Sequence, residues 1–300
     1  VELCFGHGDA TVELQQIRFG GNPANIVQAE NPDGTIAVFI NDEWLFGGPE
    51  KEGGVLGTGR FYRGGYAHGP NAYMEGRLGK LLPHYHGLCR LVLEGVYLGT
   101  SAYIKPIGIV VKRVPNTLAL TGGRHDIDGD ANAAAMIHEI LTDQSWGCAL
   151  DPALIDAPGL RRVGDTLFAE KTGLSLIAEG SQSDGQTLIS EILRHVDGTL
   201  YTDPRSAAIT VALARKDYTI DDLLVLDVPN VSKVEISRGQ WSETRNSIRL
   251  TYTDRAQDFT VRTVQAQDLA NFFARGNEVA VEEIELSGLS NATAARNAVE

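Results

Sequence analysis

The residues best suited to metal chemistry in this chain are two histidines separated by one position, His84 and His86. Alternate residues of an extended strand point to the same face, so both imidazoles would lie together on one side of a strand edge. A transition-metal site needs further ligands, and neither an acidic residue nor a cysteine stands at a telling spacing from this pair. We therefore interpret the two histidines as surface or loop residues, with a metal pair as the alternative.

Three aspartates at alternate positions, Asp126, Asp128 and Asp130, are superficially like the start of a calcium loop. In an EF-hand loop a glycine occupies position six and a glutamate position twelve. Here the glycine falls at the wrong place and position twelve is Ile137. We interpret these aspartates as a turn followed by the N-cap of a helix, with a weak cation site as the alternative.

Two further histidines lie on predicted helices. The zinc-protease motif His-Glu-x-x-His is absent at His138-Glu139, because the residue four positions after His138 is Thr142. His195 lies next to Arg194 in the last turn of its predicted helix. A cation at that end is favoured by the helix dipole, and this is the role that we expect for His195.

The sequence gives little support for a nucleophilic or a glycosidase active site. The Gly-x-Ser-x-Gly nucleophile elbow is absent. Glu170 and Glu179 could form a glycosidase pair, but geometry rather than abundance defines such a pair, and no aromatic sugar platform accompanies them. We expect the three tryptophans, Trp44, Trp146 and Trp241, to fill the core. The sequence therefore predicts no catalytic, cofactor-binding or metal-binding residue, and a protein that is not an enzyme.

The composition of the chain is typical of a globular protein with an acidic surface. The chain has 300 residues, of which 43% are hydrophobic and 22% charged, and its formal net charge is −13. A protein that grips nucleic acid usually carries the opposite sign, because phosphate neutralisation supplies most of the affinity. An acidic surface would instead repel duplex DNA, although such surfaces chiefly keep proteins soluble.

The three cysteines, Cys4, Cys89 and Cys148, form no Cys-x-x-Cys motif, so we expect free, largely buried thiols in a reducing cytoplasm. We find no signal peptide and no apolar run of membrane-spanning length. The chain begins at Val1 without a methionine and ends inside a predicted helix, so we expect a segment of a longer polypeptide.

Three regions follow from the local patterns, and together they predict an α+β fold that is predominantly β. Residues 1–120 alternate short strands with a glycine-rich loop at 46–59, where glycine allows positive φ and close backbone approach. We expect the N-terminal part of this first β module to be missing. The predicted strands cover 11–19, 35–40, 88–93 and 107–114, with a short helix at 71–80.

Residues 121–225 form a compact α+β insert with three helices and a hairpin. The helices are predicted at 131–142 with Asp130 as N-cap, at 158–171 with Asp156 as N-cap, and at 186–196 with Ser183 or Asp184 as N-cap and Gly198 as the end. The hairpin pairs residues 199–202 with 208–213 around the turn Asp203-Pro204-Arg205-Ser206.

Residues 226–300 return to β structure, in a second module that we expect to be truncated at its C-terminus. The predicted strands are 230–237, 246–253, 259–264 and 279–286, and the predicted helices are 267–274 and 291–300.

Several blocks of this sequence occur in a recognisable order. They are Trp44-Leu45-Phe46-Gly47-Gly48, Tyr97 to Pro106, Ala133 to Gly147, Asp165 to Leu176, Ile192 to Tyr201 with Asp203-Pro204, and Trp241 to Asn246. With these blocks, nearly the whole chain resembles the tail tip or baseplate hub proteins of long-tailed bacteriophages and gene transfer agents, a family of phage tail proteins.

The resemblance implies a structural hub built from two tail-tube-like β modules per chain that flank the insert. Such hubs are homotrimers whose modules form a pseudo-sixfold ring, which continues the hexameric tail tube at the virion tail. The resemblance further implies contacts with the distal tail protein, other tail tip proteins and the tape measure protein, and an indirect role in attachment to the host cell surface. Double-stranded DNA would pass through without specific binding during ejection.

The same resemblance places assembly in the bacterial host cytoplasm and carries no catalytic residue over to this chain. We also keep an alternative of a different class, a cell-wall-degrading tail enzyme that hydrolyses glycan or peptide bonds with acidic residues.

Overall fold

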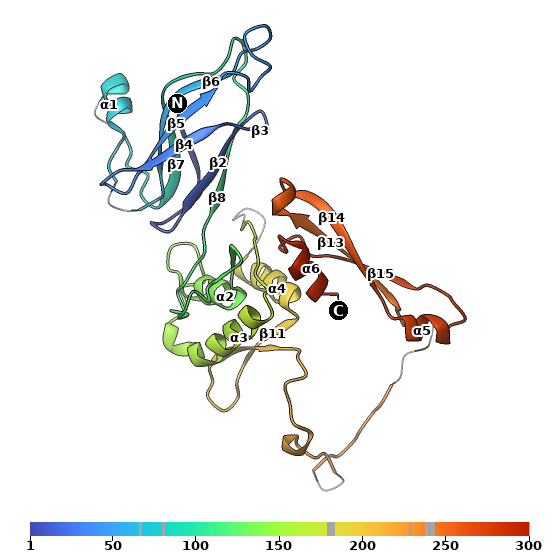
Figure 1. The fold of residues 1–300 in the computed structure, drawn as a ribbon. Coiled ribbons are helices and arrows are strands. Elements are labelled where there is room, and N and C mark those ends of the chain that lie inside the picture. Colours follow the sequence, from blue (N-terminus) through green and yellow to red (C-terminus); the bar gives the residue numbers. More distant parts are fainter. Residues whose placement is uncertain are drawn as a thin grey trace. The chain divides into compact units, whose positions relative to one another are not determined.

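The computed structural model describes residues 1–65, 68–79, 82–178, 184–227, 230–237, 240 and 244–299. The chain divides into two compact units, Val1–Val114 and Pro115–Glu300. Strands and helices both occur, and strands hold more of the described residues, so the predicted α+β, predominantly β class is confirmed (Figure 1).

The first unit is built from two antiparallel sheets. The larger sheet has the strand order β1-β7-β6-β5-β4, and the smaller has the order β3-β2-β8. The strands are β1 (Glu2–His7), β2 (Glu13–Phe19), β3 (Asn22–Pro23), β4 (Ile26–Glu30), β5 (Ile36–Asp42), β6 (Val55–Tyr62), β7 (Leu88–Tyr97) and β8 (Ile107–Lys112). A short helix, α1 (Ala72–Leu78), is capped by Asn71.

Alternation along the strands explains the core of this unit. In β5 the side chains of Ile36, Val38 and Ile40 are buried, whereas Phe39 between them is exposed. β7 is mostly apolar, with Arg90 and Glu94 as its charged residues, and its residues 89–93 are buried. The predicted strands at 11–19, 35–40, 88–93 and 107–114 and the predicted helix near 71–80 are confirmed.

The glycine-rich connection between β5 and β6 approaches its neighbours closely, as predicted. Gly47, Gly48 and Gly53 have φ angles of 91°, 75° and 79°, a region that non-glycine residues rarely adopt. A Cβ atom on Gly54 would lie 2.0 Å from the carbonyl oxygen of Asp42, so this position has room for glycine alone.

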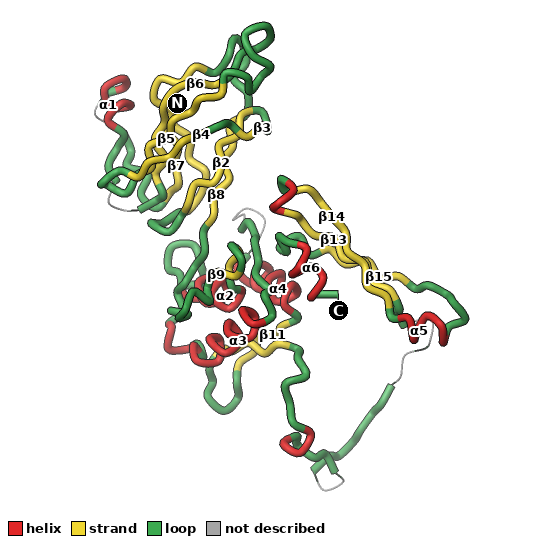
Figure 2. Tube along the Cα trace, in the orientation of Figure 1, coloured by secondary structure: helices red, strands yellow, loops and turns green. Residues whose placement is uncertain are grey.

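The second unit joins a helical layer to a small sheet (Figure 2). The helical layer contains α2 (Ala133–Thr142), α3 (Ala157–Ala169) and α4 (Gly185–Val196), together with the hairpins β9 (Asp126–Ile127)–β10 (Asp130–Ala131) and β11 (Gly198–Thr202)–β12 (Ile209–Leu213). The sheet has the order β14-β13-β15. Its elements are β13 (Ser247–Asp254), β14 (Thr260–Gln267), α5 (Leu269–Ala274), β15 (Val281–Glu285) and α6 (Ala292–Asn297).

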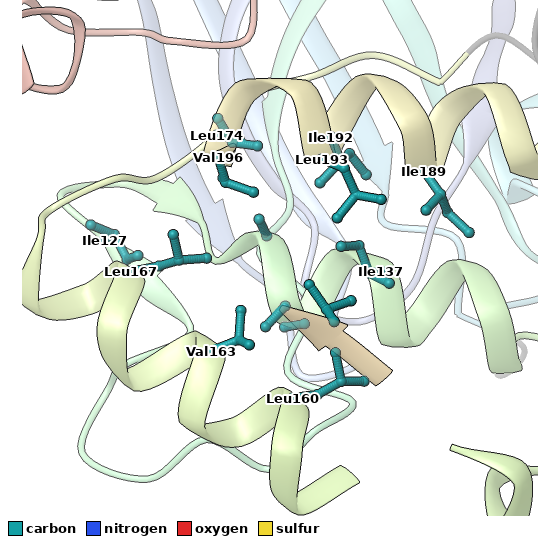
Figure 3. Packing of buried hydrophobic residues seen from close by; sticks show 14 of the residues in the cluster. Ile127, Ile137, Leu160, Val163, Leu167, Leu174, Ile189, Ile192, Leu193 and Val196 are labelled. Atoms are coloured by element: carbon teal, nitrogen blue, oxygen red, sulfur yellow. The ribbon is translucent and has the colours of Figure 1, made fainter. Parts of the chain in front are cut away.

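One apolar cluster runs through this second unit. Figure 3 shows Leu160, Val163 and Leu167 of α3 facing Ile192 and its neighbours on α4. The cluster continues to Leu250 and Tyr252 of β13, which are buried. These spacings are the apolar stripes of amphipathic helices and the alternation of a half-buried strand, so the sequence patterns indicate the elements correctly.

Helix ends follow the predictions only in part. Asp156 and Asp184 cap α3 and α4 through backbone N–H groups three residues later, as predicted. The prediction for Asp130 was wrong, because Asn132 caps α2. The prediction that Gly198 ends α4 was also wrong, because Asp197 at φ 51° is the left-handed cap and Gly198 already begins β11.

A long connection links β12 to β13, and its residues 216–227 and 230–237 are called the arm below. The strand predicted at 230–237 was wrong, because this segment has no strand assignment in the structure. The arm contains one short turn of 3-10 helix at Ile220–Asp222. A strand requires a neighbouring strand for its backbone hydrogen bonds, and within the described residues of one chain none lies beside this segment.

Candidate functional site

The two candidate metal-binding histidines lie in a loop, in keeping with our interpretation of them as surface or loop residues. His84 and His86 are exposed, and their ring centroids are 5.2 Å apart. Among the residues that the structure describes, no group of three or more histidine, cysteine, aspartate or glutamate side chains could hold a metal ion. The geometry therefore supports the surface-loop interpretation.

The three alternating aspartates perform a structural role. Asp126 accepts a 2.7 Å hydrogen bond from the backbone N–H of Gly129, which closes the turn between β9 and β10. Asp128 has a φ of 52° in that turn. The turn interpretation is confirmed, whereas the third residue, Asp130, is bound elsewhere rather than to a helix.

Asp130 is the centre of a buried polar cluster that joins the helical layer to the C-terminal sheet. Its carboxylate is fully buried and accepts a 2.6 Å ion-pair contact from Arg255, which follows β13. The hydroxyl of Ser290 donates to the other oxygen, and Asn291 lies 3.5 Å from it. Burial raises the pKa of Asp130, against the lowering effects of Ser290 and Arg255.

Arg255 also binds the turn itself. Its guanidinium donates to the carbonyl oxygens of Asp128, at 2.8 Å, and Gly129, at 3.2 Å. One side chain therefore fixes three consecutive residues that lie about 125 positions away in the sequence. This cluster of Asp130, Arg255 and Ser290 positions the sheet on the helices.

His195 makes a second connection of the same kind. Its Nδ1 lies 2.8 Å from the carbonyl oxygen of Glu191, and its Nε2 accepts a 2.9 Å hydrogen bond from the backbone N–H of Gly288. The carbonyl requires a proton on Nδ1, and the N–H requires a lone pair on Nε2, so the ring is neutral. Burial lowers the pKa of His195, and the expectation of a cation for the helix dipole was therefore wrong.

The neutral His195 predicts acid sensitivity at this connection. Its pKa in the folded state lies below the value of about 6.5 in an unfolded chain, so the unfolded state binds the proton more readily. Its contribution to stability is present above about pH 6.5 and is lost as the pH falls through the lowered folded pKa. We expect hydrogen exchange at the amide of Gly288 to accelerate between pH 7 and 5, after correction for the intrinsic exchange rate.

The variant His195→Gln should abolish that pH dependence at Gly288, because the substituted side chain does not titrate. An unchanged pH profile in His195→Gln would contradict the assignment.

The remaining candidate catalytic groups are also engaged in structure. His138 is buried, and its Nδ1 lies 2.9 Å from the hydroxyl of Thr117, while burial lowers its pKa. Glu170 forms a two-point ion pair with Arg215, with contacts of 2.7 Å and 3.0 Å. Glu179, the other member of the considered glycosidase pair, lies outside the described residues.

Two expectations about buried side chains were wrong. Trp44 is 68% exposed and Trp146 is 36% exposed, so neither fills the core, and Trp241 lies outside the described residues. All three cysteines are free, as predicted, but only Cys89 is buried. Burial raises the pKa of Cys89 to about 11, which keeps this thiol protonated and unreactive.

Exposed apolar surface, rather than a catalytic cluster, is the most distinctive feature that the structure adds. Leu223, Leu224, Val225 and Leu226 of the arm are consecutive, and 49–83% of each residue is exposed. Isolated exposed apolar residues are ordinary, whereas a contiguous group marks an interaction site. This group was not among the predicted sites, although the run of four apolar residues between Asp222 and Asp227 is visible in the sequence.

Sheet edges provide a second kind of exposed surface. β14 lies at the edge of its sheet over eight residues, and Val261 on it is 71% exposed. In the first unit, β4 is an edge strand that exposes 65% of Val27. Unpaired strand edges carry free N–H and C=O groups, which pair readily with another chain.

No helix among the described residues has both the length and the apolar character needed to cross a membrane.

Comparisons with known proteins point to phage tails. Residues 184–300 match the family model described as "Putative phage tail protein". The fold of the whole chain is similar to that of a chain in the structure titled "Virion of native gene transfer agent (GTA) particle", with a TM-score of 0.54 and 18% sequence identity. That alignment covers 100% of this chain and 70% of the other. No curated protein sequence matches the chain.

Proposed function

We propose that this chain is a structural component of a phage-type tail, and that it forms a trimeric hub ring at the tail tip. The observation that carries the proposal is the agreement of two comparisons, a tail-protein family over residues 184–300 and the fold of a gene transfer agent virion chain over the full length. Neither comparison names the hub, the trimer or the DNA passage, which therefore belong to the proposal alone.

Unpaired strand edges in both units favour a closed ring. Each unit has at least one exposed edge strand, β4 in the first and β14 in the second. The β sheets of the first unit and the sheet β14-β13-β15 of the second would each act as a tail-tube-like module on either side of the helical insert, so that three copies present six modules around the ring. In a ring with closed point-group symmetry every such strand edge can pair with a neighbouring copy, whereas an open arrangement leaves one unpaired edge at each end.

The charge of the chain supports a conduit for DNA rather than a DNA-binding protein. Copies with a net charge of −13 would present an acidic bore to duplex DNA. The ring would contact the distal tail protein, other tail tip proteins and the tape measure protein, and would act in host attachment only indirectly. Assembly would take place in the cytoplasm of the bacterial host.

Light scattering coupled to gel filtration tests the ring. We expect a mass of about three times 32.4 kDa for the purified chain. The variant Val261→Lys places a charge on the outer edge strand β14 and should shift the mass to that of the monomer. Thr187→Lys is a matched control, because Thr187 is exposed on the helix α4 and has no strand edge.

A sharp, stable monomer of the unmodified chain would contradict the ring. The alternative, a cell-wall-degrading enzyme, is separated by an assay on peptidoglycan. The structural proposal expects no turnover, whereas turnover that one carboxylate substitution abolishes would favour the enzyme.

A further inference from the structure

The second unit contains an open apolar groove of about 640 Å³. It is formed by the end of α2 and the residues after it, one side of α4 and the hairpin β11–β12. Its apolar lining comprises Leu141, Leu150, Ile189, Leu193, Leu200 and Ile209. Cys148, whose thiol is free and exposed, also lines the groove.

Among the described residues that line the groove, Arg194 alone carries a full charge. Its guanidinium already contacts Glu191 at 2.6 Å and the carbonyl oxygen of Glu285 at 2.7 Å. The groove is therefore an apolar surface with a single cation at its rim, and it would prefer an apolar segment with acidic flanks, which could share Arg194 with Glu191.

The chain itself contains a segment of that chemistry. The tetrapeptide Leu223-Leu224-Val225-Leu226 is exposed, and it stands between Asp222 and Asp227 in the sequence. Asp221 and Asp227 are exposed as well. In the structure of one chain the groove is open and the tetrapeptide is exposed, so neither covers the other. If neighbouring copies exchanged their arms, the groove and the tetrapeptide would both be buried.

We propose that residues 223–226 of one copy bind in this groove of a second copy. The inference rests on the proposed assembly of several copies, and it adds the contact that links each copy to the next. Apolar side chains of the tetrapeptide pack against the half-buried Leu200 and Ile209 of the neighbour, and an aspartate beside them lies near the neighbour's Arg194. In a closed ring every arm and every groove is used.

The native thiol in the groove allows a direct test. In the background Cys4→Ser, the exposed Cys4 is removed and Val225→Cys introduces one thiol into the tetrapeptide. A disulfide forms only if the Cα atoms of the two cysteines come within about 7 Å. After oxidation in solution, non-reducing electrophoresis should shift the monomer band to covalent dimers and trimers, and reduction should reverse the shift.

Two control variants define the specificity of the cross-link. Cys148→Ser in the same background should abolish it. Ile236→Cys is the matched control, because Ile236 is an exposed residue on the same arm that lies outside the tetrapeptide. It should remain a monomer on the non-reducing gel, and equal cross-linking by both arm positions would overturn the inference.

The remaining outcomes separate this inference from the proposed function. An intramolecular disulfide, seen as a monomer whose mobility changes on reduction, would overturn binding by a second copy. Trimers by light scattering without any cross-link would overturn the arm contact and leave the ring standing. Monomers without a cross-link would overturn both.

Discussion

Replacing Arg90 with alanine is expected to destabilise the first unit by roughly 3–5 kcal/mol, because it breaks a buried ion pair. Arg90 is 1% exposed. Its guanidinium contacts Glu2 at 2.8 Å and lies 3.8 Å from the ring centre of Tyr62. It also donates to the carbonyl oxygen of Gly69 at 2.5 Å. The substitution would leave the carboxylate of Glu2 without its partner and a void beneath the ring.

Urea unfolding measures this loss, and Arg63→Ala is the matched control. Arg63 contacts Glu30 at 3.0 Å, but that carboxylate is 58% exposed, so the pair contributes about 1 kcal/mol or less. Arg90→Lys should fall between the two, since it keeps the charge and loses the planar fork of donors. Similar unfolding midpoints for Arg90→Ala and Arg63→Ala would refute the assignment of Arg90 as a core residue.

Arg255→Ala should destabilise the attachment of the C-terminal sheet by about 2–3 kcal/mol, since it leaves the buried carboxylate of Asp130 with less compensation. The figure is set below that for Arg90 because the Arg255 side chain is 37% exposed and its charge is screened by solvent. The cluster joins the sheet to the helical layer, and Arg255 directly follows β13. Hydrogen exchange of β13 should therefore accelerate more than that of α3.

A second substitution separates charge from packing at this cluster. Asp130→Asn added to Arg255→Ala removes the buried charge and keeps an acceptor for Ser290, so it should recover part of the lost stability. Arg249→Ala is the control, because its partner Glu283 on the same sheet is 70% exposed. The assignment fails if the double variant is less stable than Arg255→Ala alone.

Local patterns in the sequence predict most of the elements. The stripe of Leu160, Val163 and Leu167 and the caps at Asp156 and Asp184 depend on residues within one or two turns, and they are confirmed. The predicted helix cap at Asp130 was wrong because its carboxylate binds Arg255, which is 125 positions away in the sequence. Sequence spacing carries no information about such contacts.

The strand predicted at 230–237 was wrong for a different reason. Its alternation of apolar and polar residues fits a strand, but a strand is completed by a neighbour, and the described part of a single chain provides none there. In the same way, a positive charge was predicted for His195 from its place in the last turn of α4. Its neutral state depends on Gly288, 93 positions later.

The candidate interaction surfaces were only partly visible from sequence. The tetrapeptide 223–226 stands out as an apolar run between aspartates, but whether other parts of the fold cover it is seen only in the structure, where the described residues leave it exposed. The groove brings together Leu141, Ile189 and Ile209, which belong to different elements. A pattern along one element does not reveal such a surface.

The symmetry of the assembled particle tip tests the central claim most directly. Electron microscopy of particles that carry this chain should show three copies in one closed ring on the tail axis, with two β modules per copy around an acidic channel. A single copy of the chain away from the axis, or a ring whose inner wall is strongly electropositive, would contradict the account.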